Sequence, residues 1–593
     1  MPGFLGKVGG VKTDFFFSKN RNKKLINKKL LLNDFYIEQR TIDKFQQDKI
    51  FENNGQYFVL TEGVILNSHE LIEKYQTESL FEAIITMYKK IGSDFFKEFR
   101  GSFSGVFFDK KRNKKIIYTS HIGDKQVFYS QIGSDLVFGS DINYIVDYYQ
   151  TNNLQYTLNK KAAYYLLTFG FMLEDNTIFS QINKLIAGHY ILIENGKLEI
   201  IQYYKLDNTP NYEQSEEEII ENIDRLFRQA IKRAFDKDLE YNYQHLVSLS
   251  AGLDSRMTTW VANDLGYGGN IVNFTFSQSD YLDETVPKKI ASDLKHQWIF
   301  KALDNGLFLQ ELENVIKRSA GELYYWGLAL VESFFDLIDK ENFGINHTGQ
   351  LGDVILGTYY SSLDKDKNYT LTDGANSVLL ANKLEKNWIK FDYANEEIFK
   401  FYGRGFNGIV QGILLTQETM EYYSPFCDVD FLQYSLQIPL ELRYHHAIYI
   451  KWILTKYPKA ADYKWEKIKR KLSDKKIKVF LKRVSQRLTR YFRKILKIKY
   501  NPLNTKQHMN PLDYWYNTNK DLKIFLDQYF NSNINRLDFE EELKTDCIYL
   551  YQKGRCFEKA QVLTLLAVLK IYFANNDITD FFVDIYGGRK NHA

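Results

Sequence analysis

Short apolar runs, rich in β-branched and aromatic side chains and bounded by Gly, Asn or Asp, recur along the first part of the chain. They predict strands at residues 56–60, 103–108, 115–120, 126–130 and 189–194. Helical periodicity at residues 79–90 and 159–168 interrupts these strands. We therefore expect residues 1–206 to form an α+β domain dominated by antiparallel strands.

A polar segment at residues 207–214, which contains Pro210, precedes a different pattern. Ser215 and Glu218 have the spacing of a capping box at the start of a helix with one apolar face. The pattern continues as strand 245–249, helix 256–264, strand 271–276, helix 284–294 and strand 297–300. This alternation predicts a parallel sheet, whose ligands bind at the carboxyl ends of the strands. From about residue 307 the pattern is mostly helical, so we expect an α/β domain over residues 215–470 and a helical extension over residues 471–593.

The loop after the first strand of that sheet reads Leu-Val-Ser-Leu-Ser-Ala-Gly-Leu-Asp-Ser-Arg over residues 246–256. We expect Gly252 to adopt a positive φ and to leave room for a phosphate, because it has no side chain. The unpaired N–H groups at the start of the next helix favour an anion. Ser250 and Ser255 add hydroxyl donors, and Asp254 adds a carboxylate suited to Mg²⁺. The loop therefore predicts a pyrophosphate site, and the alternative is an ordinary strand-to-helix turn capped by Ser or Asp.

Composition narrows the class of protein. With 593 residues, 44% hydrophobic and 26% charged, the chain should hold two or three globular domains. A net charge of +4 is nearly neutral for this length, so we expect no specific nucleic-acid binding. Its 3 cysteines, Cys427, Cys547 and Cys556, exclude a disulfide framework and a CxxC zinc site. Together with the lack of a signal-peptide pattern or of an apolar run near 20 residues, they favour a cytoplasmic protein.

Further segments of the second half carry a family resemblance. Residues 348–359 read Thr-Gly-Gln-Leu-Gly-Asp-Val-Ile-Leu-Gly-Thr-Tyr, and residues 424–428 read Ser-Pro-Phe-Cys-Asp. Ile-Pro-Leu-Glu-Leu-Arg follows at residues 438–443, and Trp-Glu-Lys at residues 465–467. With the 246–256 loop, these segments resemble, in order, the SGGxDS, SGEGxDE and PFLD motifs and the late lysine of the asparagine synthetase family. The resemblance implies an ATP-pyrophosphatase domain of the adenine nucleotide α-hydrolase type.

The first half also resembles this family, with departures. Residues 101–109, 123–129 and 182–190 are similar to its G-x-F-A-F, G-I-K-P-L-Y-Y and LpPGhy segments, which implies a sandwich of the Ntn glutaminase (class II amidotransferase) type. However, Pro2 occupies the place of the nucleophilic Cys, and Arg100 that of the Asp before the G-x-F-A-F strand. Glu62-Gly63-Val64 replaces the N-G-E segment, and no thiol precedes Cys427. Hydrolysis of glutamine through a thiol needs that nucleophile, so we expect the domain to lack glutaminase activity.

The resemblance also implies roles for individual residues. The group expected to bind ATP and pyrophosphate is Ser248, Leu249, Ser250, Gly252, Asp254, Ser255, Phe276 and Gly349. Asp254 and Asp353 are the expected Mg²⁺ ligands, with Asp254 and Lys467 as catalytic residues, and Lys464 or Lys469 as alternatives to Lys467. Glu284 either reaches the nucleotide or starts a helix, and Asp428 orients the site rather than reacting.

Two departures bear on the reaction. The Glu of SGEG is Gln350 here, which cannot take a proton from an amine, and the second acid of the DE pair is Val354. We expect an ATP-dependent, AMP-forming ligase that joins a carboxylate to ammonia or an amine, with ATP and Mg²⁺ as cofactors. The acid is aspartate, as in asparagine biosynthesis, a sugar acid or a peptide, and Gln350 favours an acid other than aspartate. Two alternatives stay open: an intramolecular amide cyclase similar to β-lactam synthetases or lasso-peptide cyclases, and a non-catalytic nucleotide-binding scaffold.

A basic segment follows the late lysine. Residues 464–499 hold sixteen Lys or Arg and two acids, with apolar residues at helical spacing. This pattern predicts an amphipathic helix at residues 471–499 that binds an anionic membrane surface or an acidic partner. The alternative is a solvated helix with one face packed on the domain. A homodimer is left open.

Overall fold

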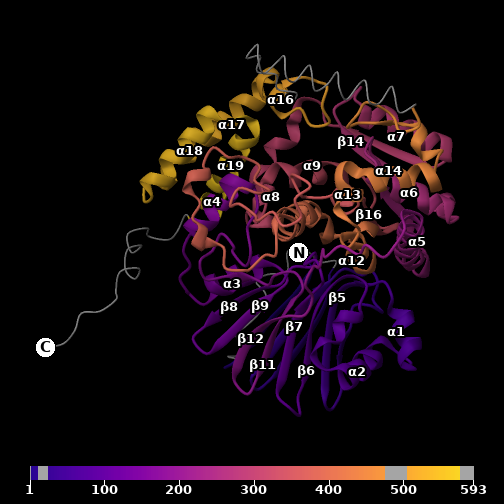
Figure 1. Cartoon of the computed structure of the whole chain (residues 1–593). Coiled ribbons are helices and arrows are strands. Elements are labelled where there is room, and N and C mark those ends of the chain that lie inside the picture. Colours follow the sequence, from indigo (N-terminus) through magenta and orange to yellow (C-terminus); the bar gives the residue numbers. More distant parts are fainter. Residues whose placement is uncertain (1, 11–24, 475–503, 574–593) are drawn as a thin grey trace.

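The computed structural model describes residues 2–10, 25–474 and 504–573. Two six-stranded antiparallel sheets lie in the N-terminal part, below the rest of the chain in Figure 1. One has the order β10-β8-β9-β1-β3-β2 and the other β12-β11-β7-β6-β5-β4. The strands of the first sheet are β1 (Gly3–Val8), β2 (Ile26–Leu32), β3 (Phe35–Thr41), β8 (Phe128–Ile132), β9 (Asp135–Gly139) and β10 (Asn183–Lys184). Those of the second are β4 (Phe51–Asn53), β5 (Tyr57–Ile65), β6 (Gly101–Asp109), β7 (Lys114–Thr119), β11 (His189–Glu194) and β12 (Lys197–Gln202).

Apolar side chains of both sheets meet in one core, which contains Phe4, Ile37, Leu60 and Val106. Helices α1 (Ser68–Tyr75) and α2 (Leu80–Ile91) share a second core with the outer face of the β5–β6–β7 sheet. Helices α3 (Ile142–Thr151) and α4 (Lys160–Phe169) share a third core with the other sheet. The predicted strands and helices of this region are confirmed, and they form a sandwich of two sheets with helices on the outside.

The second half contains a five-stranded parallel sheet of order β15-β14-β13-β16-β17. Its strands are β13 (Gln244–Ser248), β14 (Ile271–Ser277), β15 (Gln297–Ala302), β16 (Phe343–His347) and β17 (Glu421–Tyr423). Helices α5 (Glu216–Glu240), α6 (Asp254–Asp264) and α7 (Leu282–Leu294) accompany them. From β13, the chain adds β14 and β15 on one side and then β16 and β17 on the other. The loops that follow β13 and β16 therefore start from neighbouring strands, both at the carboxyl edge of the sheet. Such a switch point is where open parallel sheets bind ligands.

Two details of the sequence prediction can be checked in this half. The capping box is confirmed: the Ser215 hydroxyl accepts a hydrogen bond from the backbone N–H of Glu218, and the Glu218 carboxylate accepts one from the backbone N–H of Ser215. The expectation of mostly helix after about residue 307 missed β16 and β17, which complete the parallel sheet. Both strands are short, at 5 and 3 residues, which gives too few positions for a period to show.

Helices complete the C-terminal part, coloured yellow in Figure 1. They are α16 (Leu512–Thr518), α17 (Lys520–Asn533), α18 (Glu541–Lys553) and α19 (Cys556–Tyr572). Their apolar residues share one core with α4 and with α8 (Leu312–Ser319) and α9 (Tyr325–Phe335). Of the predicted basic helix, residues 475–499 lie outside the described residues. Among the described helices, none combines the length and the hydropathy needed to cross a bilayer.

Candidate functional site

The loop between β13 and α6 closes on itself through its serines. The backbone N–H of Ser250 donates to Oγ of Ser255 at 2.9 Å, and the two hydroxyl oxygens are also 2.9 Å apart. The backbone N–H of Gly252 donates to Oγ of Ser250 at 3.1 Å. The expected positive φ of Gly252 is wrong, because this glycine is not among the residues with left-handed backbone. The turn is instead held by the serine hydroxyls, and they leave the start of α6 facing the sheet edge.

Two carboxylates meet at the start of α6. The helix begins at Asp254, two residues earlier than predicted, so Asp254 and Ser255 belong to its first turn. Oδ2 of Asp254 accepts from the backbone N–H of Asp353 at 3.0 Å, and Oδ1 accepts from the hydroxyl of Tyr449 at 2.9 Å. Loss of water and repulsion by the Asp353 carboxylate hold the pKa of Asp254 well above its usual range. Two oxygen ligands that repel each other are a set that Mg²⁺ would stabilise.

Glycines bring the loop after β16 against this turn. A Cβ on Gly349 would lie 2.3 Å from the backbone nitrogen of Ser255, and one on Gly352 would lie 2.7 Å from Cγ of Asp254. Neither position has room for a side chain, so both glycines are needed for the two loops to pack. The structure therefore brings Gly349 and Asp353 to Asp254, as the resemblance implied.

The charge of Lys467 acts on both carboxylates, where it opposes the rise in the pKa of Asp254 and Asp353 that burial causes. Its Nζ is 2.6 Å from Nε2 of His446 and 5.8 Å from the ring centre of Trp465. Lys464 contributes its backbone carbonyl, which accepts from Arg256 at 2.7 Å. Of the candidate lysines, we therefore retain Lys467, whose charge acts on both Asp254 and Asp353.

Sequence reasoning missed the residues that hold these pieces together. The buried guanidinium of Arg256 donates to the carbonyls of Ala251 and Lys464, at 3.1 and 2.7 Å, and so joins the β13 loop to the segment that carries Lys467. Asp283 accepts from the backbone N–H of Ala251 at 2.9 Å, and burial together with the charge of Glu466 raises its pKa to about 7. These roles depend on contacts across long sequence separations, which no local pattern signals.

Both ends of the Gln350 amide make hydrogen bonds within the protein. Its Nε2 donates to the carbonyl of Ile409 at 2.9 Å, at the end of the π-helix η6 (Phe401–Ile409). Its Oε1 accepts from the hydroxyl of Tyr422 at 2.6 Å. Val354 is half-buried and packs on the apolar core. Gln350 is therefore a fixed structural residue rather than a proton acceptor.

The remaining nucleotide-site candidates lie along the same edge. Ser248 ends β13 opposite Phe274, and the backbone N–H of Leu249 donates to the carbonyl of Phe274 at 2.9 Å. Phe276 lies in β14, with its ring 6.1 Å from that of Phe334.

Two acids considered at the sequence level take structural positions. Glu284 accepts from the backbone N–H of Asp280 at 2.7 Å, so it supports the start of α7. Asp428 is the N-cap of α12 (Val429–Leu436) and accepts from the backbone N–H of Asp430 at 3.1 Å. Both contacts favour the structural reading of these acids.

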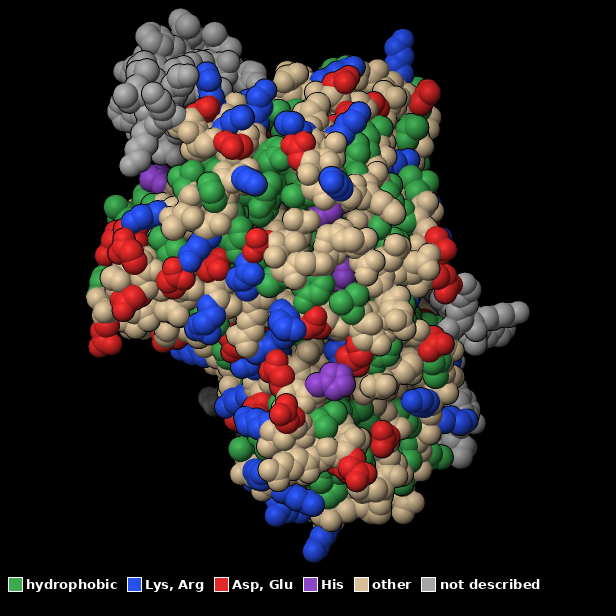
Figure 2. Space-filling model, turned by 90° about the vertical axis from the view of Figure 1, so that its right-hand side faces the viewer, with side chains coloured by type: hydrophobic (Ala, Val, Ile, Leu, Met, Phe, Trp, Pro, Cys, Tyr) green, Lys and Arg blue, Asp and Glu red, His purple; other side chains and the backbone are tan. Residues whose placement is uncertain are grey.

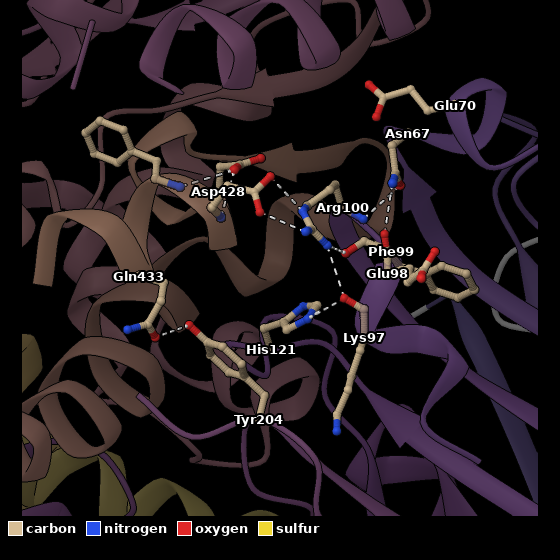
Figure 3. Close-up of polar contacts among 12 residues, drawn as sticks. Asn67, Glu70, Lys97, Glu98, Phe99, Arg100, His121, Tyr204, Asp428 and Gln433 are labelled. Atoms are coloured by element: carbon tan, nitrogen blue, oxygen red, sulfur yellow. Dashed lines mark hydrogen bonds and ion pairs between the residues drawn. The ribbon is translucent and has the colours of Figure 1, made fainter. Parts of the chain in front are cut away.

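In the N-terminal half, Arg100 joins the two halves of the chain. In Figure 3 it points toward the start of α12, and it binds the Asp430 carboxylate with two hydrogen bonds of 2.9 and 2.7 Å. Arg233 of α5 contacts the same carboxylate at 3.1 Å and Glu70 at 3.2 Å. The residue in place of the family's Asp therefore belongs to an ion-pair group between the halves.

Glu62 is likewise committed to packing. It is 2% exposed and accepts from Gln39 at 3.0 Å and from Thr41 at 2.9 Å. Nζ of Lys49 lies 3.9 Å from Glu62 and 2.8 Å from Glu421 of β17. Lys125 completes this buried group, 2.7 Å from Glu421. The thiols of Cys427, Cys547 and Cys556 are buried, which raises the pKa of each and disfavours the thiolate.

Comparisons with known proteins match this chain to two kinds of protein. Residues 41–204 match the model of the glutamine amidotransferase domain. A Methanocaldococcus jannaschii protein named for glutamine-hydrolysing asparagine synthetase is 27% identical over 256 residues, 42% of this chain and 48% of that protein. Glutamine-hydrolysing asparagine synthetase 2 of Bacillus subtilis is 24% identical over 349 residues, 54% of this chain and 45% of that protein. The chain thus spans about half the length of these curated relatives.

One solved structure, the glutamine phosphoribosylpyrophosphate amidotransferase from B. subtilis, matches 50% of this chain and 59% of its own. The TM-score is 0.22 at 10% identity.

Proposed function

We propose that this chain, which is similar to asparagine synthetases over part of its length, is an ATP-dependent, AMP-forming ligase that makes a C–N bond on a carboxylate. The observation that carries this proposal is the group of Asp254, Asp353 and Lys467 at the start of α6. Two carboxylates that repel each other are stabilised when a metal ion binds between them. A lysine and a helix N-terminus favour the negative charge of a phosphate chain.

The proposed roles follow from these positions. The start of α6, with Ser248, Leu249, Ser250, Ser255 and Gly349, would receive the phosphates of ATP, and the backbone near Phe276 the adenine. Asp254 and Asp353 would hold Mg²⁺, which neutralises phosphate charge when bound. Lys467 would stabilise charge on the α-phosphate as the adenylate forms and collapses.

In the first step, a substrate carboxylate oxygen attacks the α-phosphorus and pyrophosphate leaves. In the second, a nitrogen attacks the acyl carbon, AMP leaves and the nitrogen loses a proton.

We propose that the N-terminal half has no glutaminase activity, so that the nitrogen comes from ammonia or an amine. Support comes from the buried thiols and from Arg100 and Glu62, whose charges are taken up by structural contacts. The half would then serve as a structural partner of the ligase site.

A non-catalytic scaffold is the second candidate, and the engaged side chain of Gln350 favours it. The same observation favours an acid other than aspartate, since the group best placed to deprotonate ammonia is missing. An amine on the substrate itself, as in an intramolecular cyclase, would avoid that need.

Basic and acidic side chains are interspersed over the face in Figure 2, which gives no support to nucleic-acid binding.

Exchange of labelled pyrophosphate into ATP tests the proposal. Purified protein is given Mg²⁺, ATP and a panel of acids: aspartate, uronates and short peptides with a free amine. We expect exchange that depends on one acid class and is abolished by Asp254→Ala, whereas Asp366→Ala, at an exposed loop position, leaves it unchanged. Nucleotide binding without exchange across the panel would favour the scaffold, and no binding of ATP or AMP would contradict both readings.

A further inference from the structure

His446 lies in contact with the lysine of the proposed site, and the family motifs do not include it. Its Nε2 is 2.6 Å from Nζ of Lys467, and the residue is 9% exposed. Lys467 itself is accessible to solvent. The ammonium thus contacts a ring nitrogen of a nearly buried residue, while the lysine itself remains exposed.

The backbone around His446 is specialised for this contact. His445 and His446 have φ of 58° and 62°, so two successive residues with side chains adopt the left-handed conformation before α14 (Ala447–Lys456). Such conformations are costly and persist where the surroundings enforce them, often at functional sites. Here they turn the imidazole back toward the sheet edge.

Gly357 and Trp465 fix the ring from two directions. A Cβ on Gly357 would lie 2.3 Å from Nδ1 of His446 and 2.2 Å from the carbonyl oxygen of Asp353. This glycine therefore sits between the imidazole and the metal-ligand segment, where no side chain would fit. The Trp465 ring lies 5.9 Å from the imidazole, so the same aromatic group borders both His446 and Lys467.

The chemistry of the two groups fixes their roles. An ammonium group only donates, so the nitrogen of His446 that faces it must accept through its lone pair, and the imidazole is neutral in this state. A lysine side chain has a flexible stem and many rotamers, so a fixed acceptor restricts where its charge lies. We propose that His446 is a positioning residue, which holds the Lys467 ammonium at the Asp254–Asp353 edge in the orientation that the α-phosphate requires. This inference rests on the proposed function.

Two substitutions separate this role from packing. His446→Phe keeps a ring of similar size but has no acceptor, and His446→Gln places an amide oxygen near the position of Nε2. We expect His446→Phe to lower the rate constant of exchange about tenfold or more, with the KM for ATP changed less than about threefold, since orientation rather than binding is lost. His446→Gln should recover the rate to within about threefold of the native protein.

A double-mutant cycle with Lys467→Met tests whether His446 acts through Lys467. In the Lys467→Met protein, His446→Phe should cause no further loss of rate. Equal losses in both backgrounds, or full activity of His446→Phe, would overturn the proposal.

A second measurement does not depend on catalysis. The rate at which acetic anhydride labels Lys467, relative to the exposed Lys464, is followed by mass spectrometry in the full-length protein. Because the hydrogen bond to the imidazole covers one side of the amine and restricts its motion, we expect His446→Phe to speed labelling at least about threefold and His446→Gln to restore the native rate. Unchanged labelling in a folded His446→Phe protein overturns the contact. Altered labelling in a chain without exchange means that the proposed function, and with it a positioning role in catalysis, has failed.

Discussion

The two halves of this chain both carry charged side chains at the positions of family motifs, but they treat them differently. At the edge of the parallel sheet, the Asp254 carboxylate accepts a hydrogen bond from the backbone N–H of Asp353 and is repelled by the Asp353 carboxylate, and the charge of Lys467 offsets part of this repulsion. In the N-terminal half, Glu62 and Arg100 are each paired with a group of opposite charge. Two acids that repel each other form a place where a cation can bind, whereas an acid and a base in direct contact stabilise the packing of the two halves. Similarity of sequence alone would have treated both halves alike.

The largest loss of activity is expected for a substitution at Asp254. Replacing it by Ala removes one of two expected Mg²⁺ ligands, so we predict that pyrophosphate exchange falls by about a thousandfold or more. The free energy of unfolding without Mg²⁺ should fall by no more than about 2 kcal/mol, because relief of the repulsion with Asp353 offsets the loss of the hydrogen bonds from Tyr449 and from the backbone N–H of Asp353. Exchange within tenfold of the native rate would show that the carboxylate pair does not carry the chemistry.

Substitutions in the buried group of Lys49, Lys125 and Glu421 should instead lower the stability of the fold. Glu421→Ala leaves two buried ammonium groups without their nearest acid, which we expect to lower the free energy of unfolding by about 3–5 kcal/mol. Urea denaturation followed by tryptophan fluorescence measures this, with the exposed Glu441→Ala as the matched control. A loss no larger than that of the control would mean that the group does not hold the halves together.

The stability that Glu421 provides should also depend on pH. Burial alone would raise the pKa of Glu421, but the charges of Lys125 and Lys49 lower it to about 2. A carboxylate with a lowered pKa contributes stability above its unfolded-state pKa, near 4.3, and loses it as the pH falls toward 2. We therefore expect Glu421→Gln to remove part of the acid sensitivity of unfolding between about pH 4 and pH 2. An unchanged pH dependence in this window contradicts the assignment.

Replacing Arg100 should lower the free energy of unfolding by less than replacing Glu421, because the Arg100 side chain is partly exposed. We predict that Arg100→Ala lowers the free energy of unfolding by about 1.5 kcal/mol, the value of a hydrogen-bonded charged contact. Arg112→Ala, whose side chain is mostly exposed, is the control and should cost less than about 0.5 kcal/mol. Arg100→Asp restores the family residue yet should give no release of glutamate from glutamine, since no thiolate is supplied.

The smallest expected effect has the opposite sign. Asp254→Asn removes the repulsion with Asp353, so in the presence of EDTA it should raise the free energy of unfolding by about 1 kcal/mol, the energy of two charges about 4 Å apart in water. The stabilisation that Mg²⁺ and ATP give to the native protein should be absent in this variant. A less stable variant in EDTA would mean that Asp254 is satisfied without a ligand.

Much of the fold followed from local pattern, and much of the site did not. Capping at Ser215 and the alternation through residue 300 predicted the first three parallel strands, because each signal lies within one element. β16 and β17 were missed because they are short, and with them the neighbouring strand that brings Asp353 to Asp254. Arg256, Tyr449 and His446 were missed because their contacts join distant segments. The φ of Gly252 was wrong because serine hydroxyls, rather than a left-handed residue, close the turn.

Activation of a carboxylate as an acyl-adenylate can be followed through a single oxygen atom. The acid that supports exchange is prepared with ¹⁸O in its carboxylate and incubated with the protein, Mg²⁺, ATP and ammonia or an amine. We expect the AMP formed to carry one ¹⁸O, because the carboxylate oxygen bonded to the α-phosphorus leaves with it. Formation of ADP with ¹⁸O in inorganic phosphate, or AMP without the label, would contradict it.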